Sequence, residues 1–168
     1  MSGTLILRQR SRARKVDLRL LRRILRTLLA DLLQRDVLEL GIYVVDELEI
    51  TRLNQTFLRH QGSTDVITFD YAEASGIGAL AGEIFVCLDE ARRQARHFRV
   101  SWQSELVRCI VHGILHLCGY DDQKKRERVR MKREEDRLLR CLAQRFAFRD
   151  VALRQDRRRR LDRGKCRP

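Results

Sequence analysis

The sequence predicts an α/β or α+β domain in which helices pack on a β-sheet, and three observations support this fold class. Short apolar runs rich in β-branched residues interleave with longer segments whose leucines recur every three or four residues. The chain has 168 residues, a length suited to one domain. It contains one proline and nine glycines, which leaves little room for a long linker. Interleaved strands and helices are typical of a sheet covered by helices.

The first half of the chain alternates between strand and helix. Residues 4–10 alternate weakly between apolar and polar and are expected to form a strand. Residues 18–32 carry leucines at the spacing of an amphipathic helix, and Asp17 stands near its start. Residues 39–46 are apolar and β-branched, which predicts a buried strand, and residues 46–60 return to helical spacing.

The second half begins with strands and ends with helices. Residues 64–71 and 82–88 have the composition of strands and are separated by a loop that contains glycine. Helices are expected at about 89–98, 102–118 and 124–146. The sequence shows no internal repeat.

The charge of the chain is unusually positive. It contains 36 basic and 23 acidic residues, so its formal net charge is +13. Such an excess suggests a polyanionic partner, either nucleic acid or an anionic membrane surface, or simply a solvated basic surface. We expect one domain over residues 1–148, followed by a basic, mobile tail over 149–168 that includes RRRR at 157–160. This tail either contacts phosphates or is only solvated.

The cysteines and the hydropathy pattern indicate a compartment. The five cysteines form no C-x-x-C pair and mostly lie in apolar runs, which is typical of buried thiols in a reducing environment. No segment approaches the roughly 18 apolar residues of a membrane span, and the N-terminus lacks a signal-peptide core. A cytoplasmic location, without membrane contact, is therefore expected.

The segment CIVHGILHLCGYDD, at 109–122, is a candidate metal site. His112 and His116 are four residues apart on a predicted helix, so both imidazoles project from one face. Gly119 is placed to end the helix and reverse the chain, which would bring Asp122 back toward the histidines. Two imidazoles and one carboxylate with an open position are typical of catalytic rather than structural zinc sites. A buried helix that merely contains two histidines is the alternative.

Other interpretations of this segment depend on its neighbours. Cys109 lies on the same helical face and could ligate, although a packed thiol is favoured, and Asp121 could replace Asp122. The spacing is similar to that of metzincin peptidases, but Gly113 stands where those enzymes need a glutamate base. Two histidines and a carboxylate would also suit a non-haem iron oxygenase, whose ligands usually lie on strands.

Three blocks of the chain together resemble the YbeY endoribonuclease family. They are LNQTFLRHQGSTDVITFDY at 53–71, AGEIFVCLDEA at 81–91 and VHGILHLCGYDD at 111–122, and the resemblance spans about residues 40–145. It implies an α+β fold with a small mixed sheet of about four strands, five or so helices, and a metal site at the end of a central helix. It also implies a metal-dependent, single-strand-specific endoribonuclease of small-subunit ribosomal RNA maturation and ribosome quality control.

The resemblance also assigns site residues and partners. His112, His116 and Asp122 match the metal ligands, and Arg59 matches the functional arginine, which would bind a phosphodiester. The third ligand of the family is typically histidine, so Asp122 is a departure, as is Ser63 in place of proline. One divalent ion is expected, zinc first, with Mn²⁺ favoured by the carboxylate.

The implied partners are single-stranded ribosomal RNA, the small ribosomal subunit and an Era-type GTPase, with no small-molecule cofactor. The alternative function is a ribosome-assembly or RNA-binding factor that carries a structural metal and cuts nothing. Completion of the coordination shell by Cys109 or another protein atom would favour that alternative.

Overall fold

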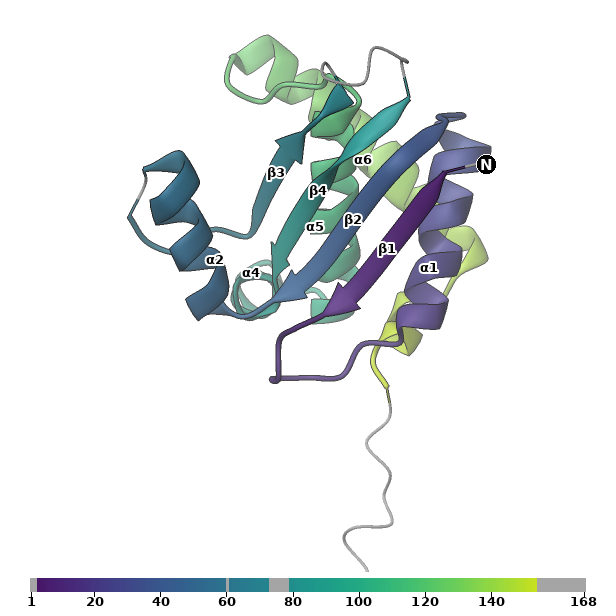
Figure 1. Cartoon of the computed structure of the whole chain (residues 1–168). Helices are drawn as coiled ribbons and strands as arrows, with labels where there is room; N and C mark the ends of the chain where they lie inside the picture. Colours follow the sequence, from purple (N-terminus) through teal and green to yellow (C-terminus); the bar gives the residue numbers. More distant parts are fainter. Residues whose placement is uncertain (1–2, 60, 73–78, 154–168) are drawn as a thin grey trace, which may run out of the picture.

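A four-stranded mixed sheet forms the centre of the computed structural model, which describes residues 3–59, 61–72 and 79–153 (Figure 1). The strands lie in the order β1-β2-β4-β3. Their bounds are Thr4–Gln9 for β1, Val37–Val45 for β2, Val66–Asp70 for β3 and Leu80–Cys87 for β4. The pairs β1–β2 and β2–β4 are parallel, and β3 is antiparallel to β4. The expected small mixed sheet of an α+β domain is confirmed.

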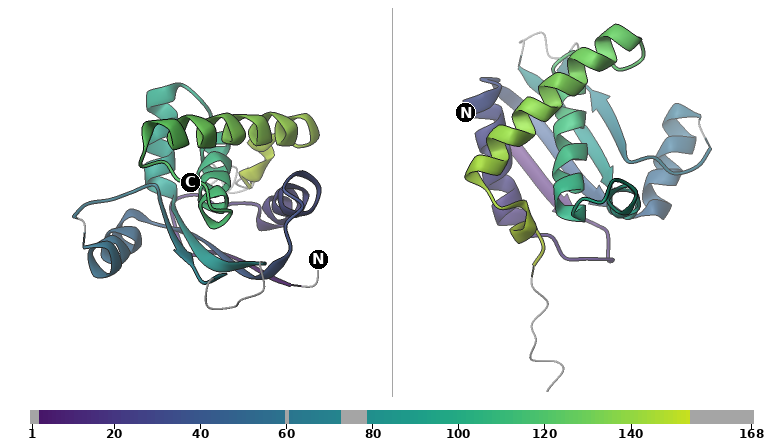
Figure 2. Two further views of the ribbon diagram at one scale, coloured as in Figure 1. Left: turned by 90° about the horizontal axis from the view of Figure 1, so that it is seen from above. Right: turned by 180° about the vertical axis from the view of Figure 1, so that it is seen from behind.

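Five α-helices accompany the sheet in the described part of the chain. They are α1 (Leu18–Arg26), α2 (Glu47–Leu53), α4 (Leu88–Phe98), α5 (Trp102–Leu117) and α6 (Lys125–Arg145). Two π-helical turns, η1 (Thr27–Leu32) and η2 (Asn54–Leu58), extend α1 and α2, and a 3₁₀ turn, η3 (Phe148–Val151), follows α6. Figure 2 shows α1, α4, α5 and α6 on one side of the sheet, whereas α2 lies beside the β3 edge.

The main core lies between the sheet and the helices on that side. The leucines of α1 and η1 that the spacing assigned to one face, such as Leu21, Leu25 and Leu28, are buried. Asp17 caps α1 by accepting hydrogen bonds from the backbone N–H groups of residues 19 and 20. A smaller cluster forms on the opposite face of the sheet, where Ile50 of α2 packs with Phe85 and its neighbours.

Helix α5 packs closely on the sheet because Gly113 has no side chain. A Cβ atom at Gly113 would lie 2.7 Å from Cγ2 of Ile84 on β4 and 3.3 Å from Oγ1 of Thr68 on β3. Ile84 is fully buried and its β-branched side chain is stiff, so it cannot move away cheaply. The glycine therefore sets how deeply α5, with its two histidines, lies against the sheet.

The variant Gly113→Ala is expected to lower the melting temperature by several degrees. Overpacking costs about 1–3 kcal/mol, and the roughly 1 kcal/mol that alanine adds in helix propensity offsets only part of this. In a domain of this size each kcal/mol corresponds to about 2–4 °C. Thermal unfolding followed by circular dichroism measures the change. Gln144→Ala, an exposed substitution on α6, is the matched control and should not lower the melting temperature.

The segment after α6 returns to the start of α1. Val151 is fully buried, and Ala152 forms an antiparallel bridge with Val16. The backbone N–H of Leu153 donates to the carbonyl of Lys15 (3.0 Å). Residues 149–153 of the predicted tail thus contact the fold, while the remainder of that tail, with its arginine run, lies outside the described residues. No helix in the described ranges is long and apolar enough to span a membrane.

Candidate metal centre

Helix α5 ends where the candidate ligands require it to end. Ser101 caps its start by accepting a hydrogen bond from the N–H of Ser104 (3.1 Å). At the other end Gly119 adopts a left-handed conformation, with φ of 85°, and its N–H donates to the carbonyl of His116 (2.9 Å). Glycine takes this conformation without steric cost, so the chain reverses here. The predicted helix end at Gly119 is confirmed.

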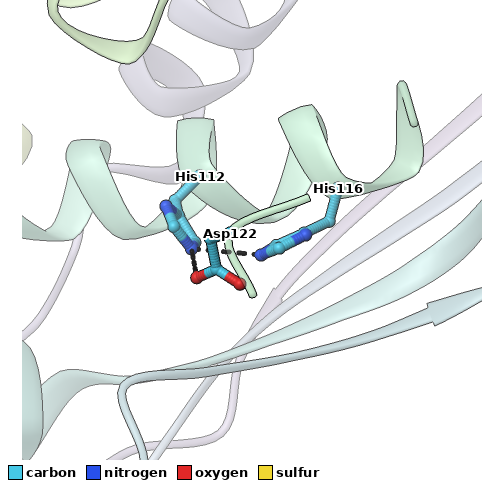
Figure 3. Close-up of side chains that lie close together, drawn as sticks. All are labelled: His112, His116 and Asp122. Atoms are coloured by element: carbon cyan, nitrogen blue, oxygen red, sulfur yellow. Dashed lines mark hydrogen bonds and ion pairs between the residues drawn. The ribbon is translucent and has the colours of Figure 1, made fainter. Parts of the chain in front are cut away.

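The reversal brings His112, His116 and Asp122 together (Figure 3). One ligand atom from each residue lies within 4.8 Å of the other two. Nε2 of His112 lies 3.1 Å from Nε2 of His116 and 3.7 Å from Oδ2 of Asp122. All three residues are partly exposed, so the cluster is open to solvent on one side.

The hydrogen bonds of the two imidazoles define their tautomers. Nδ1 of His112 lies 2.9 Å from Oε2 of Glu135, and Nδ1 of His116 lies 3.0 Å from the carbonyl oxygen of Tyr120. A carboxylate and a carbonyl can only accept, so each Nδ1 carries the proton and donates it. In neutral imidazoles, the form that binds metals, both Nε2 atoms then present lone pairs to each other at 3.1 Å.

This arrangement fits a divalent metal ion. Two unshared lone pairs at such a distance repel each other unless a cation lies between them. Nitrogen ligands at about 2.0–2.1 Å from a tetrahedral zinc lie roughly 3.3–3.4 Å apart, close to the separation of the two Nε2 atoms. The three residues supply three ligand atoms, and a tetrahedral ion would retain a fourth position.

Comparison with known proteins identifies the family. The family described as Endoribonuclease YbeY matches residues 7–143 of this chain. The chain belongs to the YbeY family. Curated members include proteins named Endoribonuclease YbeY from Chlorobium phaeovibrioides (45% identical over 54% of this chain and 60% of that protein) and Parabacteroides distasonis (43% identical over 60% and 68%). The resemblance inferred from the sequence is confirmed.

A solved structure has the same fold. The solution structure of the Thermotoga maritima protein TM1509 superposes with a TM-score of 0.59 at 26% identity. The match covers 83% of this chain and 89% of that protein. The curated YbeY relatives match over shorter stretches. The match to the Chlorobium protein covers 60% of that protein. The Aquifex aeolicus protein is 41% identical over 57% of this chain and 64% of its own length.

Glu135 is a site residue of this YbeY member that the sequence analysis missed. Its side chain is only 2% exposed and accepts hydrogen bonds from His112 and from Nζ of Lys132 (2.8 Å). Nη1 of Arg108 lies 3.6 Å away. Burial raises the pKa of this carboxyl, but the hydrogen bonds from His112 and Lys132 outweigh burial, and the pKa lies below its ordinary value. The carboxylate therefore fixes the His112 ring and its tautomer.

A signal for Glu135 was present in the sequence. The buried residues of α6 are Met131, Glu135, Leu138 and Leu142, which are spaced by four, three and four residues. A glutamate thus occupies a core position in an apolar stripe. Buried carboxylates are rare unless they are paired, so such a position indicates a partner on another element.

The alternative ligands lie outside the cluster. Asp121 accepts hydrogen bonds from the backbone N–H groups of Asp122 and Gln123 (2.7 and 3.0 Å), so it shapes the turn. Cys109 is fully buried, and its Sγ lies 3.7 Å from Nη2 of Arg108. Burial raises the pKa of this thiol well above its ordinary value, which favours the neutral form that binds metals poorly.

Arg59 lies outside the contacts of the cluster. It is exposed and ends η2 in a left-handed conformation, with φ of 55°. Within the described residues, no hydrogen bond or ion pair joins it to the candidate ligands. Asp65, which follows on the same loop, does reach α5 through an ion pair with Arg108 (3.7 Å).

A cavity of about 900 Å³ opens beside the candidate ligands, between α4, α5 and α6. His112, Asp122 and Glu135 lie in its wall. Its wall carries equal numbers of basic and acidic side chains, together with apolar ones such as Phe98 and Met131. Phe98 is 61% exposed, which leaves an aromatic surface for a ligand.

Proposed function

We propose that this protein is a metal-dependent endoribonuclease that cleaves single-stranded RNA in small-subunit ribosomal RNA maturation and ribosome quality control. The observation that carries the proposal is the pair of imidazole Nε2 atoms that converges with the Asp122 carboxylate at the wall of an open cavity. Membership of the YbeY family and the net charge of +13 support an RNA substrate.

The three ligands would hold one divalent ion, and we propose zinc, with Mn²⁺ as the alternative that a carboxylate ligand favours. A bound ion supplies positive charge that polarises the scissile phosphodiester and lowers the pKa of an attacking water. Glu135 keeps His112 in the tautomer that presents Nε2, and the Tyr120 carbonyl does the same for His116. Arg128, whose guanidinium contacts the backbone carbonyls of Asp122 and Gln123 and no described carboxylate, attracts the phosphates of the entering strand.

Arg59 is our proposed phosphate-binding catalytic residue. Its side chain is exposed and makes no ion pair with a described residue, so the guanidinium is available to a ligand. A guanidinium can bind a phosphodiester through two hydrogen bonds and stabilise the charge that develops as the bond breaks. The assignment rests on the match of Arg59 to the functional arginine of the family.

The variant Arg59→Ala is expected to cleave RNA about 100-fold more slowly, because one electrostatic contact to the reacting phosphate is worth about 10²–10³ in rate. Its melting temperature and its metal content should match those of the parent protein. Single-turnover cleavage of a labelled single strand measures the rate. Arg52→Ala, an exposed arginine in the last turn of α2, is the control. A lower melting temperature with unchanged cleavage would assign Arg59 a structural role.

The decisive test of the function is incubation of a single-stranded ribosomal RNA fragment with the metal-loaded protein. Discrete cleavage products are expected, and their loss on addition of a chelator ties them to the ion. A 2′,3′-cyclic phosphate on the products would show attack by the RNA 2′-hydroxyl instead of water. Tight RNA binding without cleavage would favour the alternative, a non-catalytic assembly factor with a structural metal.

A peptidase with this ligand spacing is a poor candidate. The position of its glutamate base is occupied by Gly113, and a Cβ atom there already lies 2.7 Å from Ile84. A glutamate has no room at this position.

The small ribosomal subunit and an Era-type GTPase are the partners we propose from the family resemblance, and the cytoplasm is the location we propose.

A further inference from the structure

Helix α6 carries a row of arginines on its solvent face. We name this row the arginine stripe, and its members are Arg126, Arg130, Arg133, Arg137 and Arg140. They are spaced by four, three, four and three residues, so they align along one face over about 21 Å of helix. All five are exposed. The stripe lies on the side of α6 away from its buried stripe of Met131, Leu138 and Leu142.

Little negative charge compensates the arginine stripe. Arg137 pairs with Glu134 (2.6 Å), and Arg130 lies over the ring of Tyr120, 5.3 Å from its centroid. Arg126, Arg133 and Arg140 have no acidic partner among the residues that the structure describes. Like charges one turn apart destabilise a helix by a few tenths of a kcal/mol per pair. A bound polyanion would relieve this repulsion.

A shallow groove of about 1170 Å³ follows the arginine stripe. All five arginines and Lys125 line it, against two acidic side chains, Glu127 and Glu134. The groove reaches Tyr120, whose carbonyl accepts the hydrogen bond from His116. It is distinct from the cavity beside the ligands, which another face of α6 lines through Arg128 and Lys132. Figure 2 shows α6 crossing α5 on the side away from the sheet. The five arginines that line the groove are exposed to solvent.

We propose that the arginine stripe binds the phosphodiester backbone of the RNA outside the nucleotides at the metal centre. The proposal rests on the proposed function only in taking RNA as the polyanion. Guanidinium groups bind phosphates through paired hydrogen bonds, and a row with one arginine per turn offers such contacts repeatedly. A membrane is a less suitable partner, because helices that bind membranes also expose an apolar face. The apolar face of α6 is buried in the core.

The test compares two variants that each lose three positive charges. The first combines Arg126→Gln, Arg133→Gln and Arg140→Gln, the members of the stripe with no described partner. The second, the control, combines Arg12→Gln, Arg14→Gln and Arg19→Gln, which are exposed residues at the start of the chain. Binding of a labelled 20-nucleotide single strand and of a duplex of equal length is measured from 50 to 300 mM salt. A chelator is present in every sample to prevent cleavage.

Loss of three phosphate contacts should reduce the slope of log Kd against log salt by about two for a single strand, since each contact contributes about 0.7. The same contacts predict a roughly 100-fold weaker affinity at 0.1 M salt. The control variant should keep the slope of the parent protein. A loss confined to the single strand or to the duplex supports the proposal and identifies which form occupies the stripe.

Two results would overturn the inference. One is that the slope of log Kd against log salt is the same for the stripe variant and for the control variant. The other is weakened binding of the stripe variant to vesicles of anionic phospholipid with unchanged binding to RNA. The result of these binding measurements does not depend on the result of the cleavage assay. A parent protein that binds RNA through the stripe but cuts nothing would contradict the proposed function and leave this inference standing.

Discussion

Replacing His116 with alanine is expected to remove the metal from the protein and to lower RNA cleavage by about 1000-fold or more. His116 supplies one of only three ligand atoms in the cluster. The charge that a metal ion supplies in a transition state is worth several kcal/mol, and each 1.36 kcal/mol is a factor of ten in rate. The fold should survive, because His116 is partly exposed and its helix is anchored by buried neighbours such as Ile114 and Leu115.

The metal content of the purified variant, measured by mass spectrometry, checks this prediction independently of activity. His97→Ala is the matched control, since His97 is also a histidine near the cavity but lies outside the cluster. Its metal content should equal that of the parent. Full metal occupancy in His116→Ala would contradict the assignment of the ligands. Equal cleavage by His116→Ala and the parent would indicate a contaminating ribonuclease.

The substitution Glu135→Gln is expected to weaken metal binding by about 10–100-fold, the usual effect of removing the hydrogen-bond partner of a ligating histidine. Glutamine keeps the volume but not the charge, so Arg108 and Lys132 lose their common carboxylate. Breaking a buried ion pair costs about 3–5 kcal/mol, and a fall in melting temperature of the order of 10 °C follows. Metal titration and thermal unfolding measure the two effects separately.

The adjacent residue provides the control for Glu135. Glu134→Gln removes an equal charge from a surface ion pair with Arg137, and it should change neither metal affinity nor melting temperature appreciably. A fully stable Glu135→Gln variant with parental metal affinity would show that the buried carboxylate does not position His112.

The pH dependence of stability gives a further readout of the same prediction. The folded protein holds the pKa of Glu135 below its ordinary value of 4.5. A carboxyl with a lowered pKa contributes stability above its ordinary pKa, and this contribution is lost as the pH falls through the lowered value. The difference in melting temperature between the parent and Glu135→Gln should therefore be largest near neutral pH and shrink below about pH 4.5.

Residues close together in the sequence made much of the fold and the cluster predictable. Hydropathy spacing located the strands and helices, and Asp17 indicated the start of α1. His112 and His116 share a helical face by their spacing alone, and the left-handed Gly119 accounts for the return of Asp122. All of these signals lie within one or two turns of the residues that they position.

Other features depend on contacts between distant elements, which one sequence does not specify. Glu135 meets His112 only because α6 crosses α5, and Arg108 meets Asp65 because α5 lies against the loop before β3. The π-helical turns η1 and η2 were expected to be ordinary helix. The place of Arg59 depends on how the loop after η2 runs, which spacing along the chain does not determine.

The position of β3 in the sheet has a consequence for synthesis on the ribosome. Its neighbour is β4, so residues 66–70 emerge before the strand with which they pair, residues 80–87. At about 5–20 residues per second, β3 waits roughly one to three seconds for its partner. The histidine-bearing helix follows later still, at residues 102–117. The nascent chain therefore has an unpaired, apolar strand before it has the candidate metal centre, and premature termination in that interval should yield an aggregation-prone product.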